Sequence, residues 1–217
     1  MDKTLKITGF GKLFVRPDTT IIKIDLINKD TSYENILKKT NENFKIIKEN
    51  LLNLNIKENQ IKTSYFKVDI DNESYRDNEG NYKTRFIGYK SYQTIKVTFK
   101  NNNKLLGDIL YILSKSSLNP TFSIEYIIKN QDRIKNKLLT NAIFDANKKA
   151  NEIAKNLNIE INEIVNVDYS FSDQNFSLSL MENQCLKAVS TKENYNFDLN
   201  PDDIEVEEKI TIIFSIK

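Results

Sequence analysis

The sequence predicts an α+β fold in which helices pack on antiparallel β-sheet, and three observations lead to this prediction. Several segments alternate apolar and polar residues, with the period of two that is typical of a half-buried strand. Two long extended runs, 61–74 and 82–100, are joined by a stretch rich in Asp, Asn and Gly, as in an antiparallel hairpin. A third segment, 131–157, has the spacing of a helix that lies flat on a sheet.

The helix expected at 131–157 carries alanines at steps of four. Residues four apart stack on one face of a helix, so these alanines form a shallow ridge that lets the backbone approach a flat partner. The four are Ala142, Ala146, Ala150 and Ala154. We expect the partner to be a β-sheet, because Gly9 and Gly11 on the inward face of the first strand would leave room for the ridge.

The other elements follow in order along the chain. Strands are expected at 5–15, 21–27, 61–74, 82–100, 122–128, 161–171 and 204–216. Helices are expected at 31–54 and 101–117, the first with Ser32 or Thr31 as its N-cap. The run 172–203 shows little periodicity, so we expect a long loop there.

The two halves of the chain, about 1–100 and 101–217, resemble each other. Each half reads strand, helix, strand, strand, and identical residues recur at an offset of 103 positions. Examples are the pairs Pro17 and Pro120, Leu54 and Leu157, and Asn55 and Asn158. We therefore expect one domain over residues 1–217, built from two βαββ halves; chance identity is the alternative, since Asn, Ile and Leu are abundant.

Composition excludes several functions. A net charge of +2 gives no long-range field to attract nucleic acid or an acidic membrane, and a single cysteine excludes an internal disulfide. The absence of histidine excludes Ser-His-Asp, Cys-His and His-ligated metal sites. The chain has no signal-peptide pattern and no run of about 18 apolar residues. We expect a cytoplasmic protein without a membrane span; an envelope location is the alternative if a leader was removed.

A few residues could still carry chemistry. Cys185 would be a nucleophile or redox sensor if a neighbouring cation such as Lys187 activated it. Three carboxylates that share one strand face could hold a hard cation or act as an acid and base pair, or they could form a solvated face opposed by Lys83 and Arg85. These are Asp69, Asp71 and Glu73. A later acidic group is expected to be a charged edge that discourages strand pairing: Asp202, Asp203, Glu205, Glu207 and Glu208.

The predicted hairpin is enriched in aromatic and cationic residues. The aromatic ones are Tyr65, Phe66, Tyr75, Tyr82, Phe86, Tyr89 and Tyr92, and the cationic ones are Lys67, Arg76, Lys83, Arg85 and Lys90. Such side chains could pair across the strands, bury against another copy of the chain, or stack on bases of single-stranded nucleic acid. As a candidate interaction surface we select Tyr65, Tyr75, Arg76, Tyr82, Arg85, Phe86 and Tyr89.

Four segments together resemble the SIMPL-type domain, a bacterial family known also from secreted, stress-associated and immunogenic proteins. They are Gly9-Phe10-Gly11 with Pro17-Asp18; Ile61-Lys62-Thr63-Ser64-Tyr65 with Gly88-Tyr89-Lys90; the pattern AxxDAxxKAxxxA, formed by Ala142, Asp145, Ala146, Lys149, Ala150 and Ala154; and Asp203-Ile204-Glu205-Val206 with Lys209-Ile210-Thr211-Ile212. The resemblance spans about 5–217. Asn158 stands where relatives usually have Gly, a position at which Asn tolerates the left-handed conformation.

The resemblance implies an α+β fold and self-association in some relatives, and it brings no catalytic residue, cofactor or metal. We therefore expect a non-enzymatic binding or self-assembling module that forms homo-oligomers and has a role related to stress. An enzyme that uses carboxylates or Cys185 is the alternative, and a binder of single-stranded nucleic acid is the third option. The sequence identifies no protein partner.

Overall fold

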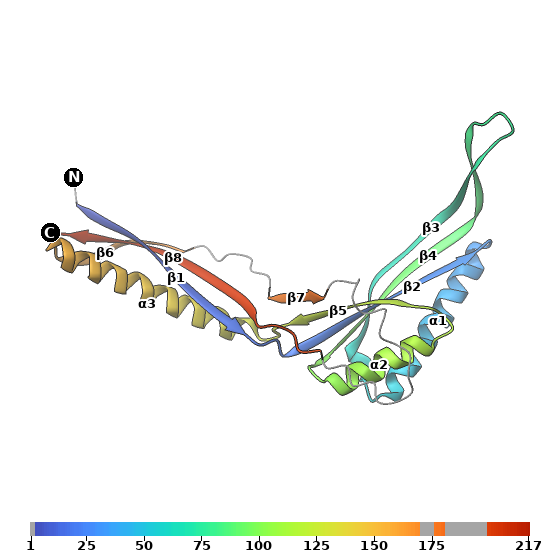
Figure 1. The fold of residues 1–217 in the computed structure, drawn as a ribbon, viewed down its shortest axis with the longest axis horizontal. Helices are drawn as coiled ribbons and strands as arrows, with labels where there is room; N and C mark the ends of the chain where they lie inside the picture. Colours follow the sequence, from blue (N-terminus) through green and yellow to red (C-terminus); the bar gives the residue numbers. More distant parts are fainter. Residues whose placement is uncertain (1–2, 170–175, 181–198) are drawn as a thin grey trace. The chain divides into compact units, whose positions relative to one another are not determined.

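The structure is a computed structural model that describes residues 3–169, 176–180 and 199–217. The chain divides into two compact units. The first consists of Met1–Asp18, Ile127–Leu178 and Pro201–Lys217, and the second of Thr19–Tyr126 and Ser179–Asn200. Each unit has its own sheet and its own apolar core, with α3 in the first unit and α1 and α2 in the second (Figure 1).

The first unit is a three-stranded antiparallel sheet with one long helix on its face (Figure 1). The strand order is β1 (Thr4–Val15), β8 (Ile204–Ile216), β6 (Ile161–Asp168), and the helix is α3 (Gln131–Leu157). The alanines of α3 are buried against Ile7 of β1 and Ile210 and Ile212 of β8. The helix therefore packs through its alanine ridge, as the sequence predicts.

Two glycines let α3 lie this close to β1. A Cβ atom on Gly9 would stand 2.1 Å from the Ala142 carbonyl oxygen, and one on Gly11 would stand 2.0 Å from the Leu138 carbonyl oxygen. Real Cβ atoms do not approach backbone atoms to such distances, so a side chain at either position would push the helix off the sheet. Gly9 and Gly11 thus have the packing role expected of them.

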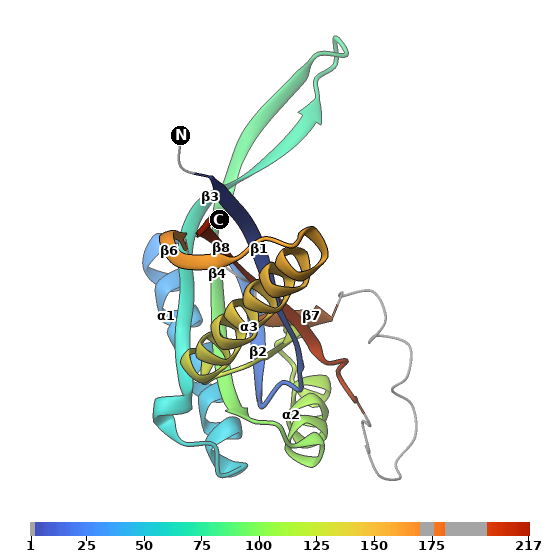
Figure 2. The ribbon, with the colours of Figure 1, turned by 90° about the vertical axis from the view of Figure 1, so that its left-hand side faces the viewer.

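The second unit is a five-stranded sheet with two helices on one face (Figure 2). The strand order is β3 (Ile61–Arg76), β4 (Tyr82–Lys100), β2 (Thr19–Asp30), β5 (Thr121–Ile127), β7 (Ser177–Leu180). The helices are α1 (Tyr33–Asn53) and α2 (Asn103–Lys115), and a 3₁₀ turn at Glu58–Gln60 precedes β3. Alternate residues of the strands, such as Ile24 and Ile95, meet Leu51 of α1 and Ile109 of α2 in the core.

The structure confirms the α+β fold and most of the predicted elements. α3 spans the predicted residues, Ser32 is the N-cap of α1, and Asn158 has the left-handed conformation at the end of α3 (φ 51°, ψ 46°). One correction concerns the run 172–203, which contains β7 where a loop was expected. A second concerns the acidic group: β8 is the central strand of its sheet rather than an edge, and Glu208 is buried.

Candidate interaction surface

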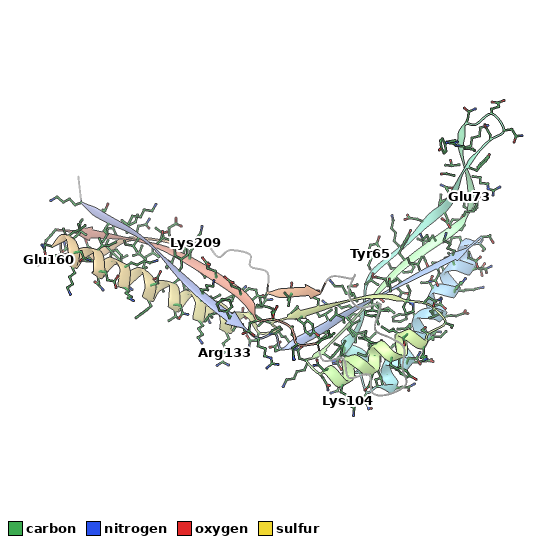
Figure 3. All side chains as sticks on the ribbon, viewed as in Figure 1. Tyr65, Glu73, Lys104, Arg133, Glu160 and Lys209 are labelled. Carbon is green, nitrogen blue, oxygen red and sulfur yellow. The ribbon has the colours of Figure 1, made fainter. Side chains whose placement is uncertain are left out.

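The candidate surface lies on the hairpin of β3 and β4, which continues beyond the neighbouring strand. The last residue pair between β2 and β4 is Asp30 opposite Tyr89, whereas β3 and β4 remain paired as far as Arg76 opposite Tyr82. The part beyond β2, residues 71–76 and 82–88, therefore consists of two strands alone, and we call it the distal hairpin (Figure 1). Figure 3 shows Tyr65 at the base of the hairpin and Glu73 farther along it.

Gly88 marks the point where the hairpin leaves the sheet. Its φ of 149° is one that residues with a side chain rarely adopt, and a Cβ atom there would stand 2.4 Å from the Asp30 carbonyl oxygen. The register of β3 and β4 also shifts here, between Asp71 and Asn72, so that Ile87 is an extra residue on β4. A bulge of this kind increases the local twist of a strand pair. The distal hairpin therefore leaves the sheet at a fixed point set by a glycine.

The turn at the tip is closed by Asp77. Its carboxylate accepts hydrogen bonds from the backbone N–H groups of Glu79 (3.0 Å) and Asn81 (2.9 Å), and it forms an ion pair with Lys83 (2.8 Å). Lys83 and these N–H groups hold the pKa of the Asp77 carboxyl below its usual value. Gly80 supplies the positive φ, 84°, that the turn requires.

The aromatic and cationic residues of the distal hairpin pair with one another across the strands. On one face, Arg85 donates to Glu73 (2.8 Å from Nε) and its guanidinium lies 5.6 Å from the centre of the Tyr75 ring. On the other face, the Arg76 guanidinium lies 4.6 Å from the centre of the Tyr82 ring and donates to the Tyr82 hydroxyl (2.6 Å). Such cation–π and cross-strand contacts contribute about 0.5–1 kcal/mol each at exposed sites.

The remaining predicted residues lie closer to the body of the unit. Tyr89 lies on the helix-covered face, where its ring makes edge-on contacts with Phe86 (5.4 Å between centres) and with Tyr33 of α1 (5.3 Å). Tyr65 lies on the opposite, open face, beside Thr94. The seven predicted residues therefore belong to one hairpin but are divided between its two faces.

An exposed apolar patch on the helix-covered face includes residues that the sequence-based selection missed. We call it the hairpin patch, and it consists of residues placed around Tyr89 by the strand register and ring contacts: Tyr33, Leu37, Phe66, Ile70 and Phe86. Phe66 is half exposed and Ile70 is 62% exposed, because α1 packs mainly on β2 and β4 and only the start of β3, at Ile61, is buried in the core. Tyr33 and Leu37 lie one helical turn apart on the side of α1 that faces β4. The helical spacing of the sequence puts both on the apolar side of α1, and only the position of α1 on the sheet shows that they border the hairpin.

The three carboxylates considered for chemistry are each held by a cation. Asp69 pairs with Lys67 (2.7 Å), Asp71 pairs with Lys29 of β2 (2.7 Å), and Glu73 pairs with Arg85. Among the described residues no group of three acidic, His or Cys side chains could hold a metal ion. Cys185 and Lys187 lie outside the described residues.

The AxxDAxxKAxxxA pattern closes the free edge of β1. The Asp145 carboxylate accepts from the backbone N–H of Phe10 (2.8 Å) and pairs with Lys149 (2.6 Å), whose ammonium group donates to the Thr8 carbonyl (3.4 Å). The Phe10 N–H and the Thr8 carbonyl lie on the side of β1 that faces away from β8. A further strand could otherwise pair with β1 on that side. Lys149 and the Phe10 N–H lower the pKa of the Asp145 carboxyl. This pair therefore bonds to backbone groups at a sheet edge.

Comparison with known families agrees with these features. The family model SIMPL, described as "Protein of unknown function (DUF541)", matches residues 5–214. The chain belongs to the SIMPL family. The match includes the glycines of β1, the hairpin, the α3 pattern and most of β8, which are the segments whose packing is described above. No curated protein matches this SIMPL chain. Within the described residues, no helix is long and apolar enough to cross a membrane.

Proposed function

We propose that this SIMPL protein is a non-enzymatic module that self-associates through the hairpin of β3 and β4. The observation that carries the proposal is the hairpin patch next to a two-stranded projection. A hairpin without further strands or a covering helix is only marginally stable in water. Here it carries large exposed apolar side chains, including Tyr82, which is 75% exposed.

The pairing of charges on the hairpin supports binding rather than catalysis. Arg85, Arg76 and Lys67 are each held by a neighbour on the same hairpin, so the surface presents ordered aromatic rings and satisfied charges. Aromatic and Arg side chains of this kind are favoured at the centres of protein interfaces. Their prior ordering lowers the side-chain entropy lost on binding.

Light scattering after size-exclusion chromatography tests the proposal. The full chain has a mass of 25.3 kDa, so we expect an eluting mass of at least about twice this value at neutral pH. Phe66→Ser should reduce the mass, because it removes an apolar anchor from the hairpin patch. Phe144→Ser on α3 is the matched control, since Phe144 is 71% exposed in the other unit. A monomer at millimolar concentration would refute self-association.

Single-stranded nucleic acid is a second candidate, supported by a row of lysines on the open face of the sheet. Lys62 of β3 lies opposite Lys96 of β4, which lies opposite Lys23 of β2. Like charges directly opposite one another destabilise a sheet, so an anionic ligand would relieve this repulsion. Lys23 is paired with Glu125 (3.0 Å), whereas Lys62 and Lys96 form no ion pair among the described residues.

Fluorescence anisotropy with a labelled single-stranded oligonucleotide tests this candidate. If it is correct, the chain binds at low salt, affinity falls steeply as salt rises, and Lys96→Glu weakens binding more than Lys45→Glu on α1 does. If the two substitutions weaken binding equally, binding depends only on the overall charge of the chain. The row of lysines is then not a binding site.

A further inference from the structure

The outer edge of β3 is the part of the hairpin best suited to pair with another strand. β3 is the edge strand of its sheet and is bonded on one side only, to β4. An edge strand offers unpaired N–H and C=O groups to another chain unless something blocks it. β3 is 16 residues long, contains no proline and has no register shift from Tyr65 to Asp71.

The edges of the other sheet differ from β3 in this respect. The free edge of β1 is occupied by Asp145 and Lys149, as described above. The edge strand β6 is irregular, with register shifts between Ile161 and Ile164 and between Ile164 and Asn166. Irregular strands, and side chains that bond to the edge backbone as Asp145 and Lys149 do on β1, hinder pairing with another strand. The backbone of β3 is regular and uncovered over residues 65–71.

The side chains of β3 are complementary to themselves in one antiparallel register. When two copies of β3 pair about a two-fold axis at Val68, Lys67 of each copy faces Asp69 of the other, and Phe66 faces Ile70. Opposite charges and apolar pairs directly across an antiparallel pair are stabilising. In this register the two members of each pair lie on the same side of the joined sheet. Lys67 and Asp69 lie on the open face, and Phe66 and Ile70 lie on the helix-covered face.

Neighbouring two-fold registers are less favourable. An axis at Lys67 places two lysines opposite each other, and an axis at Asp69 places two aspartates opposite each other. An axis at Ile70 sets Asp69 against Asp71. An axis at Phe66 gives neither like-charged nor oppositely charged pairs. Of the five registers centred on residues 66–70, only the one at Val68 sets opposite charges across from each other without a like-charged pair.

We propose that a second copy of this chain pairs with the edge of β3, antiparallel and centred on Val68, so that the two sheets become continuous. This inference rests on the proposed self-association and specifies its geometry. The two Lys67–Asp69 ion pairs, which now lie within each strand (2.7 Å), would join into a group of four alternating charges across the interface. The α1 helices do not obstruct the pairing, because α1 packs over β2 and β4.

A mixing experiment tests this register. Lys67→Asp places Asp opposite Asp in the dimer, and Asp69→Lys places Lys opposite Lys, so each variant alone should dimerise at least about tenfold more weakly than the natural chain. An equimolar mixture should recover dimers, because in the heterodimer both cross-strand pairs set an aspartate of one variant against a lysine of the other. Sedimentation velocity with one variant fluorescently labelled measures the heterodimer directly.

A cysteine at the axis provides an independent test. Residues directly opposite in an antiparallel pair have Cα atoms about 4.5–5.5 Å apart, which is within the range that a disulfide spans. In a Cys185→Ser background, Val68→Cys should therefore form a covalent dimer under mild oxidation. Ser74→Cys, six residues farther along the strand, is the control, since the two copies of residue 74 would be about 40 Å apart.

The outcomes separate the two proposals. Loss of association in both variants, recovery on mixing and cross-linking at residue 68 alone would support the β3 register. An oligomer that neither charge reversal affects, or one that cross-links equally at residues 68 and 74, would overturn the register and leave self-association standing. A chain that is monomeric in every case would overturn both. Circular dichroism of each variant checks that it is folded.

Discussion

Gly9 of β1 lies so close to Ala146 of α3 that a Cβ atom on Gly9 would stand 2.6 Å from the Ala146 Cβ. The same added atom would stand 2.1 Å from the Ala142 carbonyl oxygen, which belongs to the helix backbone and cannot rotate away. The contact explains why glycines on β1 and alanines on α3 occur together in this chain. At Gly9, α3 packs on β1 through backbone and methyl groups, without a larger side chain between them.

Gly9→Ala should lower the free energy of unfolding of the first unit by roughly 3 kcal/mol, because the helix must move off the sheet. Gly80→Ala is the control. It adds the same methyl group at a residue with a positive φ, but no described atom lies within 4 Å of the added Cβ. The control should lose about 1 kcal/mol from backbone strain. Urea denaturation of each variant measures the difference, and equal losses would contradict the close packing.

Asp145→Ala should destabilise the chain by about 2 kcal/mol at pH 7, because it removes a charge-assisted hydrogen bond to the Phe10 N–H and the partner of Lys149. The pKa of Asp145 is lowered in the folded state, so its contribution is fully present above the unfolded-state pKa, near 4. It is lost as pH falls through the lower folded-state pKa. The difference in the free energy of unfolding between the natural chain and the variant should therefore shrink as pH falls below about 4.

Denaturation at pH 7 and pH 3 measures this gap. Glu152→Ala, at an exposed position on the same helix, should change stability by less than about 0.5 kcal/mol at pH 7. A gap that stayed the same at pH 3 would mean that packing, rather than the charge of Asp145, is responsible.

Much of the fold could be predicted from the sequence, since α3, the hairpin and the strands of both sheets have clear periodicity. What periodicity cannot give is the order of strands in a sheet. The acidic residues near Glu208 are typical of an edge strand, yet β8 is bonded on both sides because β1 and β6 flank it. The division of the chain into two βαββ halves stays a prediction.

The candidate surface was predicted in part. The enrichment of the hairpin in Tyr and Arg is visible in the sequence, and so is the Gly88 position. The hairpin patch was not predictable, because Tyr33 and Leu37 satisfy the pattern of a buried helix face. Whether such a face is buried depends on where the helix lies across the strands, and α1 lies mainly over β2 and β4. The edge role of Asp145 and Lys149 depends likewise on a contact between distant segments.

Glu208→Met should stabilise the first unit by about 1–2 kcal/mol at pH 7. Glu208 is only 1% exposed, and its Oε2 atom has no hydrogen-bond partner among the described residues, so the chain bears the cost of an incompletely solvated carboxylate. Met has a similar length and carries no charge. Glu207→Met, at the exposed neighbouring position, is the control and should have little effect. A loss of stability in Glu208→Met would show that the carboxylate has a partner that stabilises it.

Thr40→Val should destabilise the second unit by about 1–3 kcal/mol, although Val has nearly the same shape. The buried Thr40 hydroxyl lies 2.6 Å from the Ser91 hydroxyl and accepts from the Asn28 amide (3.3 Å). Without it, two buried polar groups of β2 and β4 lose a partner. Thr121→Val, at an exposed position, should change the thermal midpoint little, and equal effects of the two substitutions would argue against this polar cluster.

Hydrogen–deuterium exchange at two protein concentrations tests the central claim, that the chain self-associates through the edge of β3. The backbone N–H groups of residues 65–71 that point away from β4 are unpaired in a single copy and become bonded when a second β3 adds to the sheet. We predict that peptides covering 65–71 exchange more slowly at high concentration, while peptides from the free edge of β1 do not change. Exchange in 65–71 that is independent of concentration, in a chain shown to be oligomeric, would contradict the claim.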